Sequence, residues 1–183
     1  MTSERDVLAR LRRLEDTEAI CSLKARYFAA CDGKDLQGMR DCFMPGPVHI
    51  DYGAVGVFDD RDQLVKVFRT LGCHPHIAEM HHGLNPRISF ASDDHAHGEW
   101  GLHYQQIDLR EERLTQLGAR YEDEYRRLAG EWRISATRCI VNSTLVLDLA
   151  GGTPKVLQAA GAAPPECDLA NPQSLEATRR KTR

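Results

Sequence analysis

Residues 76–147 alternate apolar and polar side chains over long segments that are separated by short turns. Ile88 and Phe90 alternate with polar neighbours before a turn at residues 92–94, and residues 129–131 form another reversal. A period of two puts one set of side chains on a buried face and the other in solvent. Long segments joined by tight reversals predict a strongly curved antiparallel sheet, which is the strongest constraint on the fold.

The first half of the chain carries helical periodicity instead. We predict helices at residues 3–14, 16–31 and 35–43, a half-buried strand at 48–52, and a further helix that ends at Gly72. The stripe expected to face inward on the first helix consists of Val7, Leu8, Leu11 and Leu14. Asp59 or Asp60 is the predicted cap of the last helix.

Helices that precede a curved sheet define an α+β layer fold, which we expect to be cone-shaped. A concave face that the helices fill only in part leaves a pocket, where small ligands usually bind. Residues 1–150 are expected to form this one domain. Residues 151–183 are rich in proline, glycine and alanine, and we predict a tail that is mobile or lies over the surface or a neighbouring subunit.

Composition excludes several classes of protein. The 24 basic and 27 acidic residues are nearly balanced, so no basic field for nucleic acid is present. Neither a signal peptide nor a membrane-spanning run is apparent, and we expect a cytoplasmic protein. The six cysteines are far apart, with no spacing typical of zinc sites, and are read as small buried side chains.

Three residues are candidates for acid–base chemistry. Asp32 ends a predicted helix just before Gly33, where a carboxylate opposes the helix dipole, so it is either a functional group or a solvated turn residue. His81 and His82 are adjacent at the start of a strand and point to opposite faces, so only one can face the pocket. Tyr27 is either a core aromatic or a hydrogen-bond donor to substrate.

Other polar residues give weaker signals. Arg138 and Asn142 lie among apolar residues of the last strand, and Arg138 either holds a polar substrate group or pairs with Asp123. His95 and His97 share one side of a strand, as do His74 and His76. No carboxylate or cysteine forms a recognisable ligand pattern with either pair, and we predict no metal.

The segments LKARYFAACDGKD, AEMHHGLNPRISFAS and RYEDEYRRLAGEWRIS, taken in order, resemble SnoaL-like members of the nuclear-transport-factor-2-like superfamily. The resemblance covers about residues 5–148. The layout is most similar to hexachlorocyclohexane dehydrochlorinase and bile-acid 7α-dehydratase, with scytalone dehydratase more distant. The resemblance implies a cystatin-like cone with a pocket, no cofactor, and a homotrimer or sometimes a dimer.

In those lyases an Asp at the end of the long helix and a His at the start of a strand form a catalytic dyad, and the matching residues are Asp32 and His81. The dehydratase also uses a Tyr five residues before its Asp, which matches Tyr27. Where the dehydratase has a further Asp, this chain has Tyr104 nearby. The remaining residues that we expect to bind substrate are Trp100, Leu102, Leu117, Tyr121, Arg138 and Asn142.

The expected function is therefore a cofactor-independent dehydratase acting on a hydroxylated, mostly apolar, steroid-like ring system. A ketosteroid-type isomerase or a polyketide cyclase would use the same pocket. A non-catalytic ligand-binding or assembly subunit, like the β-subunit of a ring-hydroxylating oxygenase, shares the fold without doing chemistry.

Overall fold

The structure, a computed structural model, describes residues 3–150. Its helices and strands are α1 Glu4–Asp32, α2 Leu36–Asp41, β1 Pro47–Asp51, β2 Val57–Asp60, α3 Arg61–Leu71, β3 Ile77–Phe90, β4 His95–Asp108, β5 Arg113–Leu128 and β6 Glu131–Asp148. The predicted tail, residues 151–183 with Cys167, lies outside the described residues. No helix among residues 3–150 is long and apolar enough to cross a membrane.

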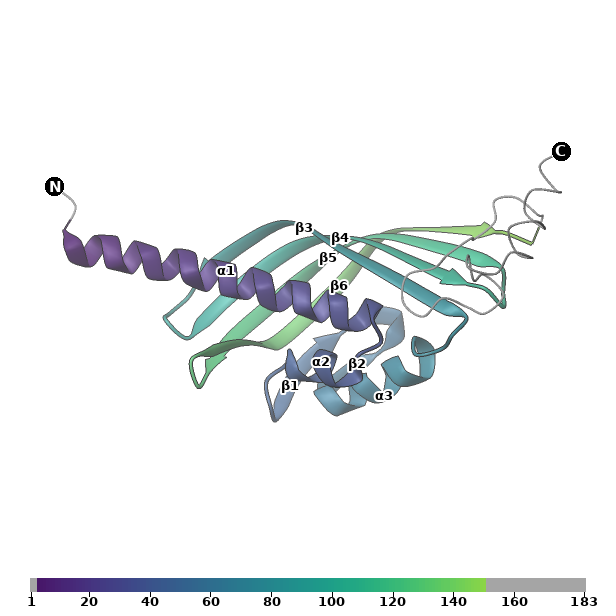
Figure 1. The fold of residues 1–183 in the computed structure, drawn as a ribbon, viewed down its shortest axis with the longest axis horizontal. Coiled ribbons are helices and arrows are strands. Elements are labelled where there is room, and N and C mark those ends of the chain that lie inside the picture. The colour runs from purple at the N-terminus through teal and green to yellow at the C-terminus, as the bar shows by residue number, and fades with distance from the viewer. Residues whose placement is uncertain (1–2, 151–183) are drawn as a thin grey trace, which may run out of the picture.

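Helix α1 is one continuous helix, where two were predicted. The expected break before Asp16 is absent because Asp16 points inward, and its carboxylate accepts hydrogen bonds from Arg127 and Trp132. Ser3 begins the helix and forms a capping box with Asp6. The first turns project past the end of the sheet (Figure 1), so the apolar stripe of residues 7–14 is exposed rather than buried.

The segment between α1 and the long strands closes one end of the molecule. Asp35 caps α2 and Asp60 caps α3, because each side chain accepts a hydrogen bond from a backbone N–H of the first turn. The predicted strand is β1, with Val48 and Ile50 buried. Strand β2 was not predicted, since only Phe58 of its four residues is buried.

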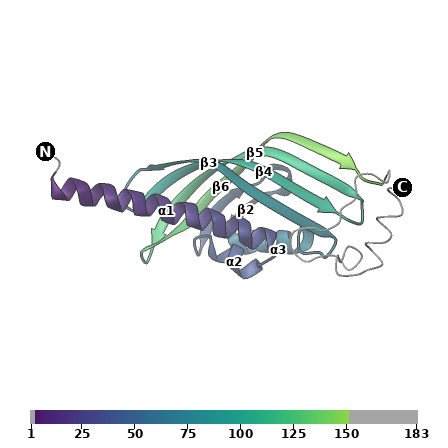
Figure 2. The ribbon, with the colours of Figure 1, turned by 45° about the horizontal axis from the view of Figure 1, so that its top comes forward.

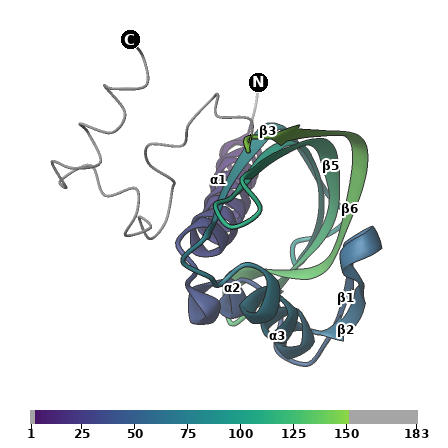
Figure 3. The ribbon, with the colours of Figure 1, turned by 90° about the vertical axis from the view of Figure 1, so that its right-hand side faces the viewer.

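The six strands form one sheet in the order β2-β1-β6-β5-β4-β3. The long strands β3 to β6 pair antiparallel as predicted, whereas β1 pairs parallel with β6, so the sheet is mixed. Figure 3 shows the long strands curving around the three helices, and Figure 2 shows α1 running across them. The predicted α+β class with a curved sheet is confirmed.

Strand β6 contains two bulges that change which side chains face inward. Tyr125 pairs with Ile134 while Glu124 pairs with Ala136, so Ser135 is an extra residue, and Asn142 is extra in the same way. Because each bulge shifts the alternation by one residue, Ile134 and Thr137 both point inward. Simple period-two reading across Ser135 therefore fails.

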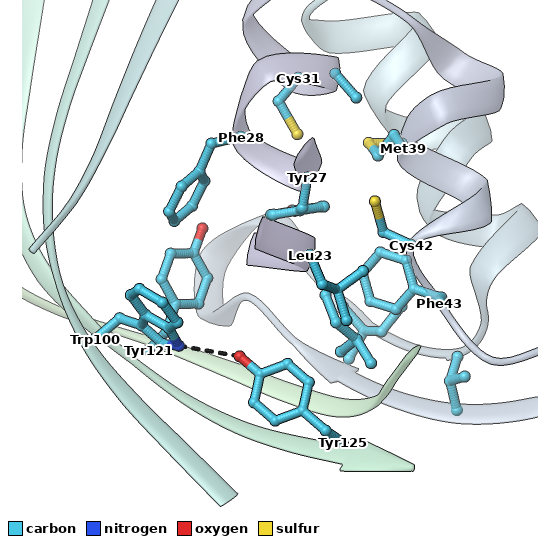
Figure 4. Close-up of a cluster of buried hydrophobic side chains, with 14 of the residues drawn as sticks. Leu23, Tyr27, Phe28, Cys31, Met39, Cys42, Phe43, Trp100, Tyr121 and Tyr125 are labelled. Carbon is cyan, nitrogen blue, oxygen red and sulfur yellow. Dashed lines mark hydrogen bonds between the residues drawn. The ribbon is translucent and has the colours of Figure 1, made fainter. Parts of the chain in front are cut away.

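The core lies between the inner face of the sheet and the helices (Figure 4). Helix α1 contributes Leu23, Tyr27 and Phe28, and the sheet contributes aromatic residues such as Tyr121 and Tyr125. The core includes Val48 and Ile50 of β1 and Trp132 and Ile134 of β6, and a cavity lies further along the strands, beside Leu117, Cys139 and Val141.

Candidate active site

A cavity of about 230 Å³ lies between the concave face of the sheet and helices α1, α2 and α3. Most of its wall is apolar. The polar side chains on it are Tyr27, Tyr52, Glu79, His81, Tyr104, Gln106 and Tyr121, and the apolar ones include Met39, Leu64, Val67, Phe68, Leu102, Leu117 and Val141. A small set of polar groups in an apolar cavity is typical of a binding site for a small molecule.

His81 lines this cavity and forms a hydrogen bond with Asp32 behind it. His81 Nδ1 lies 2.6 Å from Asp32 Oδ1, and the backbone N–H of His81 donates to Asp32 Oδ2 at 3.1 Å. A carboxylate beside Nδ1 favours the tautomer with the proton on that nitrogen. Nε2 is then the ring atom with a free lone pair, on a side chain that is only 11% exposed. The structure thus brings together two residues that lie 49 positions apart in sequence.

Local contacts where α1 meets β3 hold Asp32 and His81 in place. Gly33 ends α1 directly after Asp32, and the Lys34 ammonium group holds the start of β3 through hydrogen bonds to the carbonyls of His74 and Ile77. The two bonds that Asp32 accepts compensate a carboxylate at the negative end of a helix dipole.

Phe28 and Gly83 set the plane of the His81 ring. The Phe28 ring stacks on His81 with an interplanar angle of 13°. A Cβ atom at Gly83 would lie 2.5 Å from the Phe28 ring, so only glycine leaves room for that stacking. His82 points to the outer face beside His103, as the predicted alternation requires.

Glu79 is a polar residue of the cavity that the sequence analysis missed. The Tyr104 hydroxyl donates to Glu79 Oε1 at 2.6 Å, and Gln106 Nε2 donates to the Tyr104 hydroxyl at 3.2 Å. Glu79 Oε2 is buried without a hydrogen-bond partner among residues 3–150. Burial, and then the charge of Glu79, raise the pKa of Tyr104, which keeps its proton. The sequence contained a signal for this placement, since Glu79 lies two residues before His81 and alternation puts both on the same face of the strand.

Tyr27 lines the cavity, and its hydroxyl lies 2.7 Å from the hydroxyl of Tyr52. Burial raises the pKa of both phenols. One of the two hydroxyls donates to the other, so one proton of the pair is left for a second acceptor.

The predicted substrate-binding residues divide into two groups. Tyr104, Leu102, Leu117 and Tyr121 line the cavity. Trp100 does not, because it packs in the core and donates to the Tyr125 hydroxyl at 3.0 Å.

The placement of Arg138 and Asn142 in the interior is wrong. The bulge at Ser135 turns Arg138 to the outer face, where it is 59% exposed and lies 3.3 Å from Asp51. Asn142 is the extra residue of the second bulge and is exposed. Both errors come from extending one alternation through β6.

A second polar cluster lies deeper in the core. Lys24 Nζ is 2.7 Å from Asp123 Oδ2 and 3.6 Å from the centre of the Tyr121 ring. The other carboxylate contacts are hydrogen bonds that Thr137 and Tyr125 donate to Asp123. Asp123 therefore pairs with Lys24 and not with Arg138, the partner considered from sequence.

Within residues 3–150, the group of three side chains close enough to hold a metal ion lies on the outer face of the sheet, away from the cavity. The titratable side chains on the cavity wall are the His81 imidazole, the Glu79 carboxylate, the tyrosine phenols and the thiols of Cys31 and Cys139.

The sequence profile of the SnoaL-like domain family matches residues 12–138. Among solved structures, the LinA-type3 hexachlorocyclohexane dehydrochlorinase from Novosphingobium barchaimii LL02 superposes with a TM-score of 0.69 at 20% identity, covering 80% of this chain and 98% of that one.

Two further structures share the fold. A provisionally assigned scytalone dehydratase from Novosphingobium aromaticivorans DSM 12444 has a TM-score of 0.65 at 18% identity, over 82% of this chain and 94% of that one. A protein with a cystatin-like fold from Nostoc punctiforme PCC 73102 has a TM-score of 0.55 at 19% identity, over 69% and 91%. At these identities the likeness establishes the fold.

Proposed function

Because this chain belongs to the SnoaL-like domain family, as its motifs predicted, we propose that it is a cofactor-free lyase that removes water from a small hydroxylated ring compound. The observation that carries the proposal is the Asp32–His81 hydrogen bond of 2.6 Å at the wall of an apolar cavity. The similarity to a dehydrochlorinase and to a protein named as a dehydratase supports an elimination.

His81 is the proposed base. Its Nε2 takes a proton from a carbon atom of the substrate, the C–H electron pair forms the new double bond, and the C–O bond breaks towards oxygen. The imidazolium then gives its proton to the departing hydroxide, so that water leaves and His81 is neutral again. Asp32 holds the ring and stabilises its charged form, and a positioned base of this kind contributes about 10²–10⁴ in rate.

Glu79 and Tyr104 are the proposed groups that orient the substrate oxygen. A substrate hydroxyl group supplies the hydrogen bond that Glu79 Oε2 lacks, since leaving a buried carboxylate oxygen unpaired is costly. Tyr104, which stays protonated, stabilises negative charge that develops on oxygen. Tyr27 lies on α1. Its hydroxyl and that of Tyr52 form another part of the proposed substrate-binding surface.

The cavity favours a compact substrate. Its volume of about 230 Å³ is below the ~300–1,000 Å³ of common ligand sites. We therefore propose one or two rings in place of the steroid-like system expected from sequence. A four-ring substrate would extend beyond this volume.

The test is turnover on a panel of one-, two- and four-ring β-hydroxy ketones, followed by mass spectrometry for the loss of water. We expect elimination by the native protein, and a fall of about 10²–10⁴ in kcat for His81→Gln with the melting temperature nearly unchanged. The kcat of Asp32→Asn should fall less than that of His81→Gln, because the proposed base, His81 Nε2, remains in place. Full activity of His81→Gln on a compound that the native protein dehydrates would refute the assignment.

An isomerase is the second candidate, and the Tyr104–Glu79 hydrogen bond favours it. A protonated tyrosine beside a base suits an enolate intermediate, which shifts a double bond without a leaving group. Product mass separates the two reactions, since isomerisation leaves the mass of the substrate unchanged.

A further inference from the structure

Three potential metal ligands meet on the outer face of the sheet, opposite the cavity. His95 and His97 lie two residues apart on β4, and Glu124 of β5 stands directly across from His97 in the ladder. One ligand atom from each residue lies within 4.8 Å of the others. The carboxylate is distant in sequence from the histidines, so a spacing pattern cannot reveal it.

The distance between His95 and Glu124 suits a shared ion better than a direct bond. His95 Nε2 lies 3.5 Å from Glu124 Oε2, which is too long for a good hydrogen bond. Two ligands held at ~2.0–2.2 Å from a tetrahedral zinc ion are about 3.4 Å apart. His95 Nε2 is also buried and has no hydrogen-bond partner among the described residues.

We propose that His95, His97 and Glu124 bind one divalent transition-metal ion of the zinc class, with solvent completing the coordination. Two imidazoles and one carboxylate suit Zn²⁺, Ni²⁺, Co²⁺ or Cu²⁺, whereas Mg²⁺ and Ca²⁺ prefer all-oxygen sites. The exposed His97 side chain is free to turn towards the other two ligands.

The charges around the site are mixed. Arg126 stands across from His95 and opposes a cation. Glu99 and Glu122 form the next row of the same face, and they favour one. Those two carboxylates already pair with Arg87 and Arg120, so Glu124 is the acidic ligand with the fewest competing contacts.

A metal at this place would join β4 to β5 close to the turn at residues 92–94. Its ligands point away from the cavity, because Ala96 and Gly98, which alternate with them on β4, are buried on the inner face. The ion should therefore stabilise the folded chain without changing the chemistry of His81.

The experiment uses the full chain, stripped of metal by a chelator and titrated with Zn²⁺ alone against a chromophoric competitor at neutral pH. We expect one saturable site per chain and a higher melting temperature with Zn²⁺. The variant Glu124→Gln should bind about tenfold more weakly, and the double variant His95→Gln/His97→Gln at least about a hundredfold more weakly.

The matched control is His82→Gln/His103→Gln. It removes two histidines that lie beside each other on the same face of the sheet but are not part of the three-ligand group. Its affinity for Zn²⁺ should equal that of the native protein. Co²⁺ should give the weak visible absorption of nitrogen and oxygen ligands. No saturable binding, equal losses in both double variants, or an intense thiolate band from cysteine ligands would each overturn the proposal.

Discussion

Two polar clusters lie on the concave side of the sheet, and they differ in how fully their carboxylates are paired. In the deep cluster, the Asp123 carboxylate receives Lys24, Thr137 and Tyr125 and has no contact with the cavity. In the cavity cluster, His81 Nε2 is free and Glu79 Oε2 has no partner among residues 3–150. A buried carboxylate that has a counter-charge and two hydrogen-bond donors holds a core together, whereas a carboxylate oxygen without a partner in an apolar cavity can accept a ligand.

The largest expected effect lies in the deep cluster. Lys24→Met leaves the buried Asp123 carboxylate without its counter-charge, which should lower the free energy of unfolding by about 3–5 kcal/mol. Denaturant unfolding followed by circular dichroism measures the loss. The control Arg40→Met breaks an ion pair with Asp62 at the surface and should change stability little. Equal losses in the two variants would erase the distinction between the clusters.

A smaller effect, on rate, is expected at Glu79. Glu79→Gln keeps the shape of the side chain but removes the charge that accepts the substrate hydroxyl, so kcat should fall roughly 10–100-fold with little change in melting temperature. Glu122→Gln on the outer face is the control, and its kcat should match that of the native protein. If Glu79→Gln lowers the melting temperature and leaves kcat unchanged, both clusters are structural.

Two glycines offer a matched test of the same contrast. A Cβ atom would lie 2.5 Å from Phe28 at Gly83 and 2.8 Å from Tyr125 at Gly98. Gly83→Ala should tilt the ring that stacks on His81 and lower kcat by about tenfold. Gly98→Ala crowds the deep cluster and should lower stability by about 1–3 kcal/mol without that loss of rate. Kinetics and thermal melting of both variants decide the matter.

The smallest effect near neutral pH is that of tyrosine ionisation on stability, and tyrosines of both clusters contribute to it. The protein has five tyrosines, and burial raises the pKa of every one. The folded chain therefore keeps protons that the unfolded chain loses above about pH 10, so stability is intact below that pH and falls as pH rises through it. Phenolate absorbance should appear only together with unfolding. A gradual rise in the folded protein would contradict this burial.

The sequence predicted the fold well because its signals are local. Alternation placed long antiparallel strands within residues 76–147, and a predicted cap at Asp59 or Asp60 placed the start of α3. It failed where contacts are distant. The inward turn of Asp16 depends on Arg127, and the outward turn of Arg138 depends on a bulge at Ser135.

The candidate site was predictable only in part for the same reason. Family resemblance pointed to Asp32 and His81, whereas strand parity predicted only that one of His81 and His82 faces the pocket. The partner of Tyr104 is Glu79 on the neighbouring strand, which becomes visible only with the register of β3 and β4. Glu124 and His97 are related in the same way.

The two bulges of β6 also bear on how this strand tolerates changes in length. Deleting Ser135 or Asn142 would restore regular pairing and leave the inward residues on both sides facing inward. Deleting a residue between them, such as Ile140, would turn over the stretch beside it and exchange cavity wall for surface. Deletion of a single residue in β6 is therefore neutral for the cavity at two positions, where the strand can shorten without a change in the residues that line the pocket.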